Sequence, residues 1–251
     1  FDDARPGGTA RLYRGTIGEV RADRMEEVLP ALQALQAAVH GGSHAAGFMA
    51  YEAGYALDPA LAGAARQGEG PLLWFGLFDG FEEVEAASLL PDAAGAWNGA
   101  PEPQWSREDY LEAVATVHEQ LRAGDHYQAN LTFPCDVRFT GSPAALYARL
   151  RRASQAGWGS LIRHPGGWLL SLSPEQFFTL RDGLIEARPM KGTAAPDADE
   201  ALLTADPKSQ AENLMIVDLL RNDLARVAEP CSVAVPELFA IERYPTVTQM
   251  V

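Results

Sequence analysis

The sequence is poor in cysteine and has no long apolar run, and each shortage excludes a class of protein. Only two cysteines occur in 251 residues, Cys135 and Cys231, so we expect neither a disulfide framework nor a zinc site built on Cys and His ligands. No apolar run approaches the roughly 18 residues of a membrane-spanning helix. We therefore expect a cytoplasmic protein without a membrane partner.

Positive charge is also scarce, which limits the possible partners. Lys and Arg number 20 against 34 Asp and Glu, for a formal net charge of −14. Nucleic-acid binding depends on clustered basic side chains that release counterions, so we expect no nucleic-acid partner. An anionic small molecule is compatible with this charge only where a placed cation or a bound metal ion neutralises it.

Apolar residues make up 47% of the chain, enough to form the core of one large domain or of two lobes. A stretch rich in Pro, Gly, Ala and Asn at about 91–104 indicates a linker. We therefore predict an N-terminal lobe at residues 1–100 and a second region at 104–251. Because the last residues form an apolar, strand-like run, we also expect that a C-terminal portion is missing.

Local patterns divide the chain into strands and helices. They predict strands at residues 10–20, 47–55, 71–78, 126–133, 158–162 and 168–172. They predict helices at residues 25–39, 107–123, 143–153 and 208–224. The limits are clearest for the helix after Ser106, because Ser106 and Asp109 form a capping box and Gly124 provides a C-terminal stop.

The strongest local signal lies at residues 175–193. The Asp-Gly pair at 182–183, between two strand-like runs, predicts a hairpin with a two-residue type I′ turn. Extending the pairing outward brings Glu175 close to Lys191, an acid beside an amine. Strict alternation puts these side chains on opposite faces, whereas one β-bulge returns them to a common face. Their proximity is predicted, and their facing stays open.

The helix at 208–224 carries the next candidate group. Asp206 and Pro207 provide an N-cap and a proline at the first helical position. Apolar residues then lie nearly all round, which predicts a buried helix. Glu212 lies on this helix, and a buried carboxylate needs a cation or hydrogen bonds to offset its desolvation. Glu212 is therefore a metal-ligand candidate, with an ordinary ion pair to Lys208, four residues earlier, as the alternative. Elsewhere in the chain, we expect the Trp74-Phe75 and Phe177-Phe178 pairs to be core residues.

Five blocks of sequence, in order, resemble the signatures of the chorismate-utilising enzymes. They are YQANL at 127–131, SPE at 173–175, RPMKGT at 188–193, AENLMIVDLLRND at 211–223 and ERYPTVTQM at 242–250. The resemblance implies an α+β fold in which two large antiparallel β-sheets pack together with helices outside. It also implies that the region 104–251 is the chorismate-binding catalytic region, incomplete at its C-terminus.

Two positions resemble one branch of that family, the aminodeoxychorismate synthases. Isochorismate and salicylate synthases carry a lysine base where this chain has Gln128, and anthranilate synthases carry alanine where it has Lys191. The branch converts chorismate and ammonia to 4-amino-4-deoxychorismate, on the way to the 4-aminobenzoate of folate. Anthranilate synthase component I stays an alternative, and so does a regulatory homologue that binds chorismate or tryptophan without turnover. The family usually has histidine at the position of Gln249, whose role is left open.

The resemblance further implies catalytic roles for Lys191 and Glu175. Lysine in this position acts as a nucleophile toward the ring, for which it has to be uncharged, and burial and a nearby cation are the usual means of activating it. Glu175 corresponds to the general acid that protonates the leaving hydroxyl.

Binding roles follow in the same way. Gly192 and Thr193 correspond to substrate-contacting backbone, Gln128 is either a substrate contact or a plain strand residue, and Glu212 corresponds to a ligand of Mg²⁺. A second magnesium carboxylate is expected from the missing C-terminal portion. The implied partners are chorismate, a glutamine amidotransferase subunit that supplies ammonia, and an aminodeoxychorismate lyase, either separate or fused.

Overall fold

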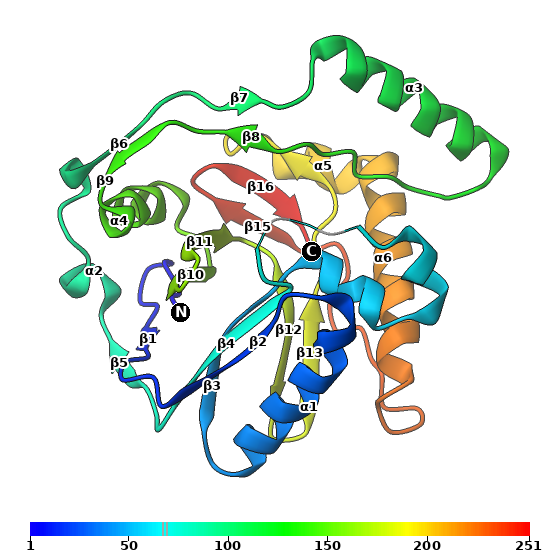
Figure 1. Ribbon diagram of the computed structural model, residues 1–251. Helices are drawn as coiled ribbons and strands as arrows, with labels where there is room; N and C mark the ends of the chain where they lie inside the picture. The colour runs from blue at the N-terminus through cyan, green and yellow to red at the C-terminus, as the bar shows by residue number, and fades with distance from the viewer. Residues whose placement is uncertain (67, 69) are drawn as a thin grey trace. The chain divides into compact units, whose positions relative to one another are not determined.

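The computed structural model describes residues 1–66, 68 and 70–251, which divide into two compact units (Figure 1). The first unit comprises Phe1–Leu90 and Ala156–Ser173, and the second comprises Pro91–Gln155 and Pro174–Val251. All strand pairs of the described chain are antiparallel. None of its helices has the length and apolarity needed to span a membrane.

A three-stranded sheet with one helix packed against it forms the core of the first unit. The sheet has the order β2 (Gly18–Ala22), β4 (Leu73–Phe78), β3 (His44–Met49), and the helix is α1 (Met25–His40). The buried cluster consists of Val20, Ala22, Val28, Ala31, Ala53, Leu72 and Leu73. The remaining elements are β1 (Ala10–Leu12), β5 (Glu82–Val84), α2 (Ala86–Leu89) and the 3₁₀ helices η1 (Tyr51–Ala56) and η2 (Pro59–Ala64).

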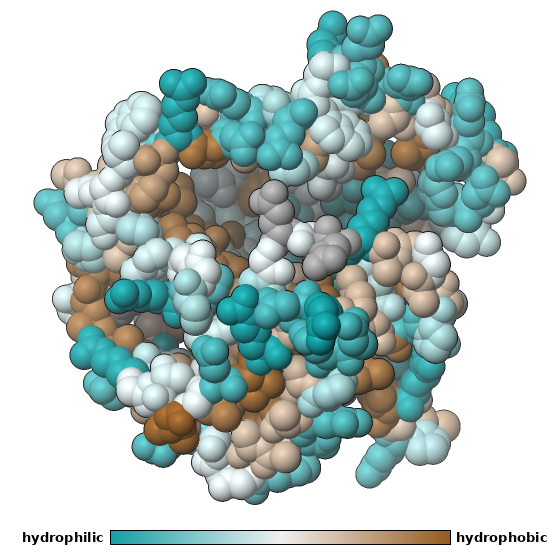
Figure 2. Space-filling model, in the orientation of Figure 1, coloured by the Kyte–Doolittle hydropathy of each residue, from teal (hydrophilic) through white to brown (hydrophobic). Residues whose placement is uncertain are grey.

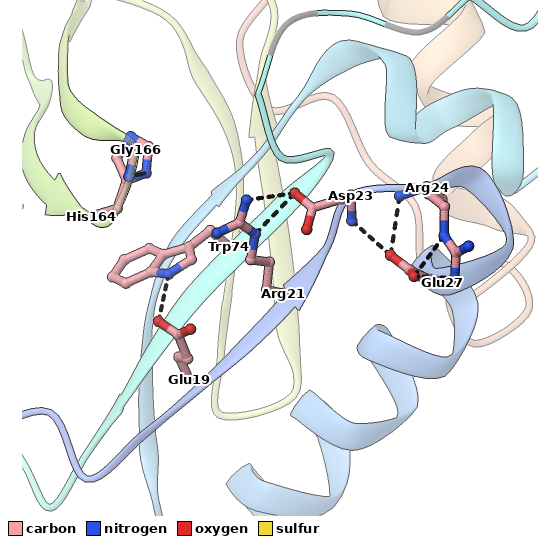
Figure 3. A network of polar contacts seen from close by, with 8 residues as sticks. All are labelled: Glu19, Arg21, Asp23, Arg24, Glu27, Trp74, His164 and Gly166. Atoms are coloured by element: carbon pink, nitrogen blue, oxygen red, sulfur yellow. Dashed lines mark hydrogen bonds and ion pairs between the residues drawn. The ribbon is translucent and has the colours of Figure 1, made fainter.

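Polar contacts in the first unit secure its own helix and sheet (Figure 3). At the start of α1, the Glu27 carboxylate accepts hydrogen bonds from the backbone N–H groups of Asp23 at 2.9 Å and of Arg24 at 3.1 Å. The Asp23 N–H, followed by the Arg24 side chain, holds the pKa of Glu27 below its usual value. On the sheet, the indole N–H of Trp74 donates to Glu19 at 3.0 Å.

The hairpin of β10 (Trp158–His164) and β11 (Gly167–Ser173) also belongs to the first unit. The linker signal places this hairpin in the region 104–251. Its backbone contacts explain why the structure groups it differently: Gly159 exchanges hydrogen bonds with Asp2 in both directions, at 2.9 and 2.7 Å. A late segment thereby becomes part of a unit built mainly from the first 90 residues.

The second unit combines helices with short strand pairs. Its first part contains η3 (Ala93–Gly95), β6 (Ala96–Asn98), β7 (Glu102–Pro103), α3 (Arg107–Ala123), β8 (Cys135–Asp136), β9 (Phe139–Gly141) and α4 (Pro143–Ser154). Its second part contains β12 (Gln176–Arg181), β13 (Leu184–Arg188), β14 (Thr193–Ala194), α5 (Glu200–Ala205), α6 (Pro207–Ala225), β15 (Ile241–Tyr244) and β16 (Val247–Met250). Strand β6 pairs with β9, β7 with β8, and β12 with β13, while β14, β16 and β15 form one sheet in that order.

Some expectations for the second unit are wrong. Residues 126–133 form no strand, because no strand of the described chain pairs with them. Helix α6 is not buried all round: Leu214 and Leu219 are 51% and 55% exposed, and its buried residues are Ser209 and Asn213. These two lie one turn apart, so the buried face of α6 is a narrow polar stripe. Figure 2 likewise shows apolar side chains at the surface among polar ones.

Candidate active site

The β12–β13 hairpin has the predicted turn. Asp182 and Gly183 have φ of 50° and 78°, the positive values that a type I′ turn requires, and Arg181 pairs with Leu184. Toward the open end the register shifts, because Thr179 pairs with Glu186 whereas Gln176 pairs with Arg188. Two residues of β12 therefore oppose one residue of β13, which is a β-bulge.

The bulge lies where it is needed to put the side chains of Glu175 and Lys191 on the same face of the hairpin. Counting outward from the Gln176–Arg188 pair sets Glu175 opposite Pro189, and Lys191, two residues further, has the same parity as Pro189. The bulge itself consists of Phe177 and Phe178, whose rings meet edge to face at 4.9 Å. They are 81% and 49% exposed, so the expectation that they are core residues is wrong.

A direct contact joins the acid to the segment that carries the amine. The Glu175 carboxylate accepts a hydrogen bond from the backbone N–H of Met190 at 3.3 Å. Met190 is buried, and Lys191, the next residue, is half-buried, whereas Glu175 is exposed. The structure thus holds the carboxylate beside the backbone from which the amine projects, as the hairpin register predicts.

The backbone on either side of that amine is paired with the end of β16. The N–H of Lys191 donates to the Met250 carbonyl at 3.0 Å, and the N–H of Met250 donates to the Gly192 carbonyl at 2.9 Å. The same Met250 carbonyl also accepts a hydrogen bond from the Asn213 side-chain amide at 3.3 Å. Asn213 is fully buried, so α6 and β16 jointly fix the position of the Lys191 backbone.

Gly192 lies where a side chain would not fit. It is buried with φ of 91°, and a Cβ there would lie 2.9 Å from Ser209 Cβ and 3.2 Å from Met250 Cβ. Ser209 belongs to the first turn of α6. Its hydroxyl and its backbone N–H both donate hydrogen bonds to the Asp206 carboxylate, at 2.5 and 2.9 Å. The Ser209 hydroxyl and then its N–H hold the pKa of Asp206 below the usual value.

Thr193 begins a row of side chains that crosses three strands. It pairs with Gln249 of β16, and its hydroxyl donates to the Gln249 side-chain carbonyl at 3.1 Å. Gln249 in turn pairs with Glu242 of β15. Directly paired residues of an antiparallel sheet share a face, so Thr193, Gln249 and Glu242 form one row. Position 249, to which the sequence assigns no role, is the cross-strand neighbour of Thr193.

Glu212 is a half-buried carboxylate on α6 with one cationic partner. Its side chain is 28% exposed, and it lies 3.3 Å from the Lys208 ammonium, the ion pair that the sequence leaves as the alternative. No group of three or more His, Cys, Asp or Glu side chains gathers as a metal site within residues 1–66, 68 and 70–251. Mg²⁺ commonly takes one or two carboxylates and completes its shell with water and substrate oxygens. The Glu212 carboxylate fits the ion as a single ligand.

Gln128 lies on neither the β12–β13 hairpin nor the β14–β16–β15 sheet, and its contact with substrate stays a prediction. It is half-buried in the irregular segment between α3 and β8. Ser209 and Met250 contribute to the site although the sequence assigns neither a role: Ser209 lies outside the five blocks, and Met250 is only the last residue of the block at 242–250. A small residue after the Asp-Pro helix start is a weak signal for Ser209. Met250 has no local signal, because its role depends on pairing with a segment far away in the sequence.

The chain is similar to known proteins over most of its length. Residues 3–251 match the family model described as chorismate binding enzyme. Aminodeoxychorismate synthase component 1 of Klebsiella aerogenes is 42% identical over 175 residues, which cover 67% of this chain and 39% of the relative. The corresponding Escherichia coli K12 protein is 41% identical over 153 residues, covering 58% and 34%. Anthranilate synthase component 1 of Pseudomonas putida is 33% identical over 204 residues, covering 78% and 41%.

Solved structures show the same fold. Anthranilate synthase component I from Streptococcus pneumoniae TIGR4 superposes with a TM-score of 0.71 at 19% identity, covering 98% of this chain and 68% of that one. The expected α+β fold of the chorismate-utilising enzymes is confirmed. The chain spans about two fifths of the length of the Klebsiella and Pseudomonas relatives. With the family model matched over residues 3–251, the chain belongs to the chorismate-binding enzyme family.

Proposed function

We propose that the complete protein is the chorismate-binding component of an aminodeoxychorismate synthase, which converts chorismate and ammonia to 4-amino-4-deoxychorismate for 4-aminobenzoate and folate. Two relatives named aminodeoxychorismate synthase component 1 are 42% and 41% identical to this chain, whereas the anthranilate synthase relative is 33% identical. One observation carries the proposal. Lys191 is half-buried, and the residue before it, Met190, donates its backbone N–H to the Glu175 carboxylate.

The proposed chemistry divides between those two side chains. The Lys191 amine attacks C2 of the ring as the C4–O bond breaks, and Glu175 donates a proton to the departing hydroxyl, which leaves as water. Ammonia then attacks C4, the C2–N bond breaks, and the amine of Lys191 is released. Pairing of the Lys191 and Gly192 backbone with Met250 supports this role, because a nucleophile has to be held within about 3–3.5 Å of its target.

Binding of the substrate falls to the surrounding groups. The Gly192 and Thr193 backbone contacts substrate, and Gln128 provides a further contact. Bound Mg²⁺, held by Glu212, would supply positive charge to the ring carboxylate. Lys208 is 80% exposed, and an exposed ammonium releases a carboxylate at a cost of about 1 kcal/mol or less.

The same proposal includes the partners and the setting. Ammonia comes from a glutamine amidotransferase subunit, a second component that the name "component 1" of these relatives suggests. An aminodeoxychorismate lyase, separate or fused, removes the product. The region 104–251 carries the catalytic groups named above, and the protein acts in the cytoplasm.

The test is the identity of the product. The full-length protein is incubated with chorismate, Mg²⁺ and ammonium, and the mixture is analysed by mass spectrometry before and after addition of an aminodeoxychorismate lyase. We expect 4-amino-4-deoxychorismate first and 4-aminobenzoate only after the lyase is added. Fluorescent anthranilate formed without lyase would instead identify an anthranilate synthase. Tight chorismate binding without any product would identify a regulatory homologue.

A further inference from the structure

Both carboxylate oxygens of Glu242, on β15, make polar contacts with residues close to the candidate site. One oxygen lies 2.6 Å from the Arg188 guanidinium, and the other accepts the Tyr244 hydroxyl at 2.6 Å. The side chains of Arg188 and Glu242 are 38% and 22% exposed, so this pair is less screened by solvent than most surface ion pairs. Charge-assisted hydrogen bonds of this length are among the stronger ones in proteins.

Tyr244 extends the contact to the other strand of the hairpin. Its ring is buried at 8% exposure, and its hydroxyl oxygen lies 3.3 Å from the Pro174 carbonyl oxygen. Glu242 and Tyr244 are two residues apart on β15, so they share a face of that strand. One face of β15 thus reaches Arg188 at the end of β13 and Pro174 just before β12.

These contacts end next to the acid and the amine. Pro174 is bonded directly to Glu175, and Arg188 lies three residues before Lys191. Strand β16, which pairs with β15, also holds the Lys191 backbone through Met250. The open end of the hairpin therefore contacts the β15–β16 pair through Arg188 at the end of β13, Pro174 just before β12 and Lys191 just after β13.

We propose that Glu242 is a positioning residue: through Arg188 and Tyr244 it clamps the open end of the β12–β13 hairpin and sets the distance between Glu175 and Lys191. This rests on the proposed function for its effect on catalysis. The clamp itself is a statement about geometry and is open to a test that needs no activity. The ladder resumes beyond the bulge only with the Gln176–Arg188 pair, so Glu175 and Lys191 lie past the last paired residues of the hairpin, where a separate tie fixes their positions.

The test combines kinetics with hydrogen exchange of the full-length protein. Glu242→Gln keeps the size of the side chain and removes its charge, and Tyr244→Phe keeps the buried ring and removes only the hydroxyl. We expect each to lower kcat between about ten- and a hundredfold, with KM for chorismate changed less than about twofold, because displaced catalytic groups lose rate rather than binding. We expect faster amide exchange in peptides covering 172–178 and 187–193.

Two further variants sharpen the result. Arg188→Gln combined with Glu242→Gln should be no slower than the worse single variant, because both remove the same contact. Arg221→Gln is the matched control, since it breaks an exposed ion pair with Asp218 on α6 and should change neither kcat nor exchange in these peptides. Unchanged exchange in Glu242→Gln and Tyr244→Phe overturns the clamp, and so does a rise in KM at constant kcat. If the wild-type protein makes no 4-amino-4-deoxychorismate, the proposed function fails, while the exchange data still decide on the clamp.

Discussion

The two units bury different kinds of residue. The first has a connected apolar cluster between α1 and the β2-β4-β3 sheet. The buried polar side chains of the described chain are concentrated in the second unit: Gln176, Ser209, Asn213 and Thr248 lie there, against Ser160 in the first. Burying a polar group without satisfying it costs about 1–3 kcal/mol, so such groups persist where they have a specific task.

Two of these polar groups, Asn213 and Ser209, hold one short backbone segment. Asn213 bonds the Met250 carbonyl that also binds the Lys191 N–H, and Ser209 packs against Gly192. In the first unit the polar contacts instead secure a helix start and an indole (Figure 3). The contrast leads to a simple expectation: changes in the first unit alter stability, and changes around Lys191 alter activity.

The largest effect is expected from Lys191→Met, which keeps most of the side-chain volume and removes the amine. If Lys191 is the nucleophile, formation of 4-amino-4-deoxychorismate should fall by about a thousandfold or more. Lys191 makes no ion pair within the described chain, so the thermal midpoint should stay close to that of the wild type. Activity within tenfold of wild type would contradict the assignment. Arg221→Met, on the surface of α6, serves as the control.

The opposite result is expected from Leu73→Ala in the first unit. Leu73 is fully buried in the apolar cluster, and removing such a side chain costs about 2–5 kcal/mol of unfolding free energy. Urea denaturation should show this loss, while kcat of the remaining folded protein should stay within about twofold. A large fall in kcat at full folding would show that the two units are not separable in this way. Exposed Leu29 of α1, changed to Ala, is the control for side-chain size.

Gly192→Ala should affect both properties. The new Cβ meets Ser209 Cβ at 2.9 Å, and φ of 91° disfavours any L side chain, so we expect a stability loss of about 1–3 kcal/mol and a fall in kcat. Adding Ser209→Gly removes the contact with Ser209 but neither the contact with Met250 Cβ at 3.2 Å nor the backbone strain, and should therefore recover part of the stability. No recovery would mean that the strain and the Met250 contact together explain the loss. Gly183→Ala in the hairpin turn, where φ is 78° and space is open, measures strain without crowding.

Local signals sufficed to predict several elements of this fold. Helix α3 starts and ends as its capping box and Gly124 indicate, and the Asp-Gly turn gives the observed hairpin. Both depend on residues that are close in sequence. The expected strand at 10–20 is instead two strands, Ala10–Leu12 and Gly18–Ala22, which pair with different partners. Strand limits depend on the partner, and the partner is distant in sequence.

In the candidate site, too, contacts between residues close in sequence were predictable and contacts between distant residues were not. The hairpin register brings Glu175 to the backbone of residues 189–191, as the observed bond to Met190 shows. The contact of Thr193 with Gln249 joins residues 56 apart, and no periodicity within either segment indicates it. Burial of α6 was overestimated for a related reason: counting apolar residues around a helix does not reveal which face has a neighbour, and here that face carries Ser209 and Asn213.

The smallest effect is a pH dependence at the start of α6. The pKa of Asp206 is lowered by the Ser209 hydroxyl and N–H, so the ionised carboxylate is bound more strongly in the folded state than in the unfolded one. Its stabilising effect is fully present above the unfolded pKa, at about 4, and is lost as pH falls through the lower folded value.

Asp206→Asn should therefore be less stable than wild type at pH 7, and the difference should shrink below about pH 4. Denaturation curves between pH 3 and 7 measure this. Ser209→Ala removes the larger cause, the hydroxyl, and keeps the N–H, so it should weaken the pH dependence without abolishing it. A constant difference between Asp206→Asn and wild type across the range would mean that this carboxylate caps the helix without its charge contributing. The packing of Ser209 against Gly192 would then depend on shape and hydrogen bonding alone.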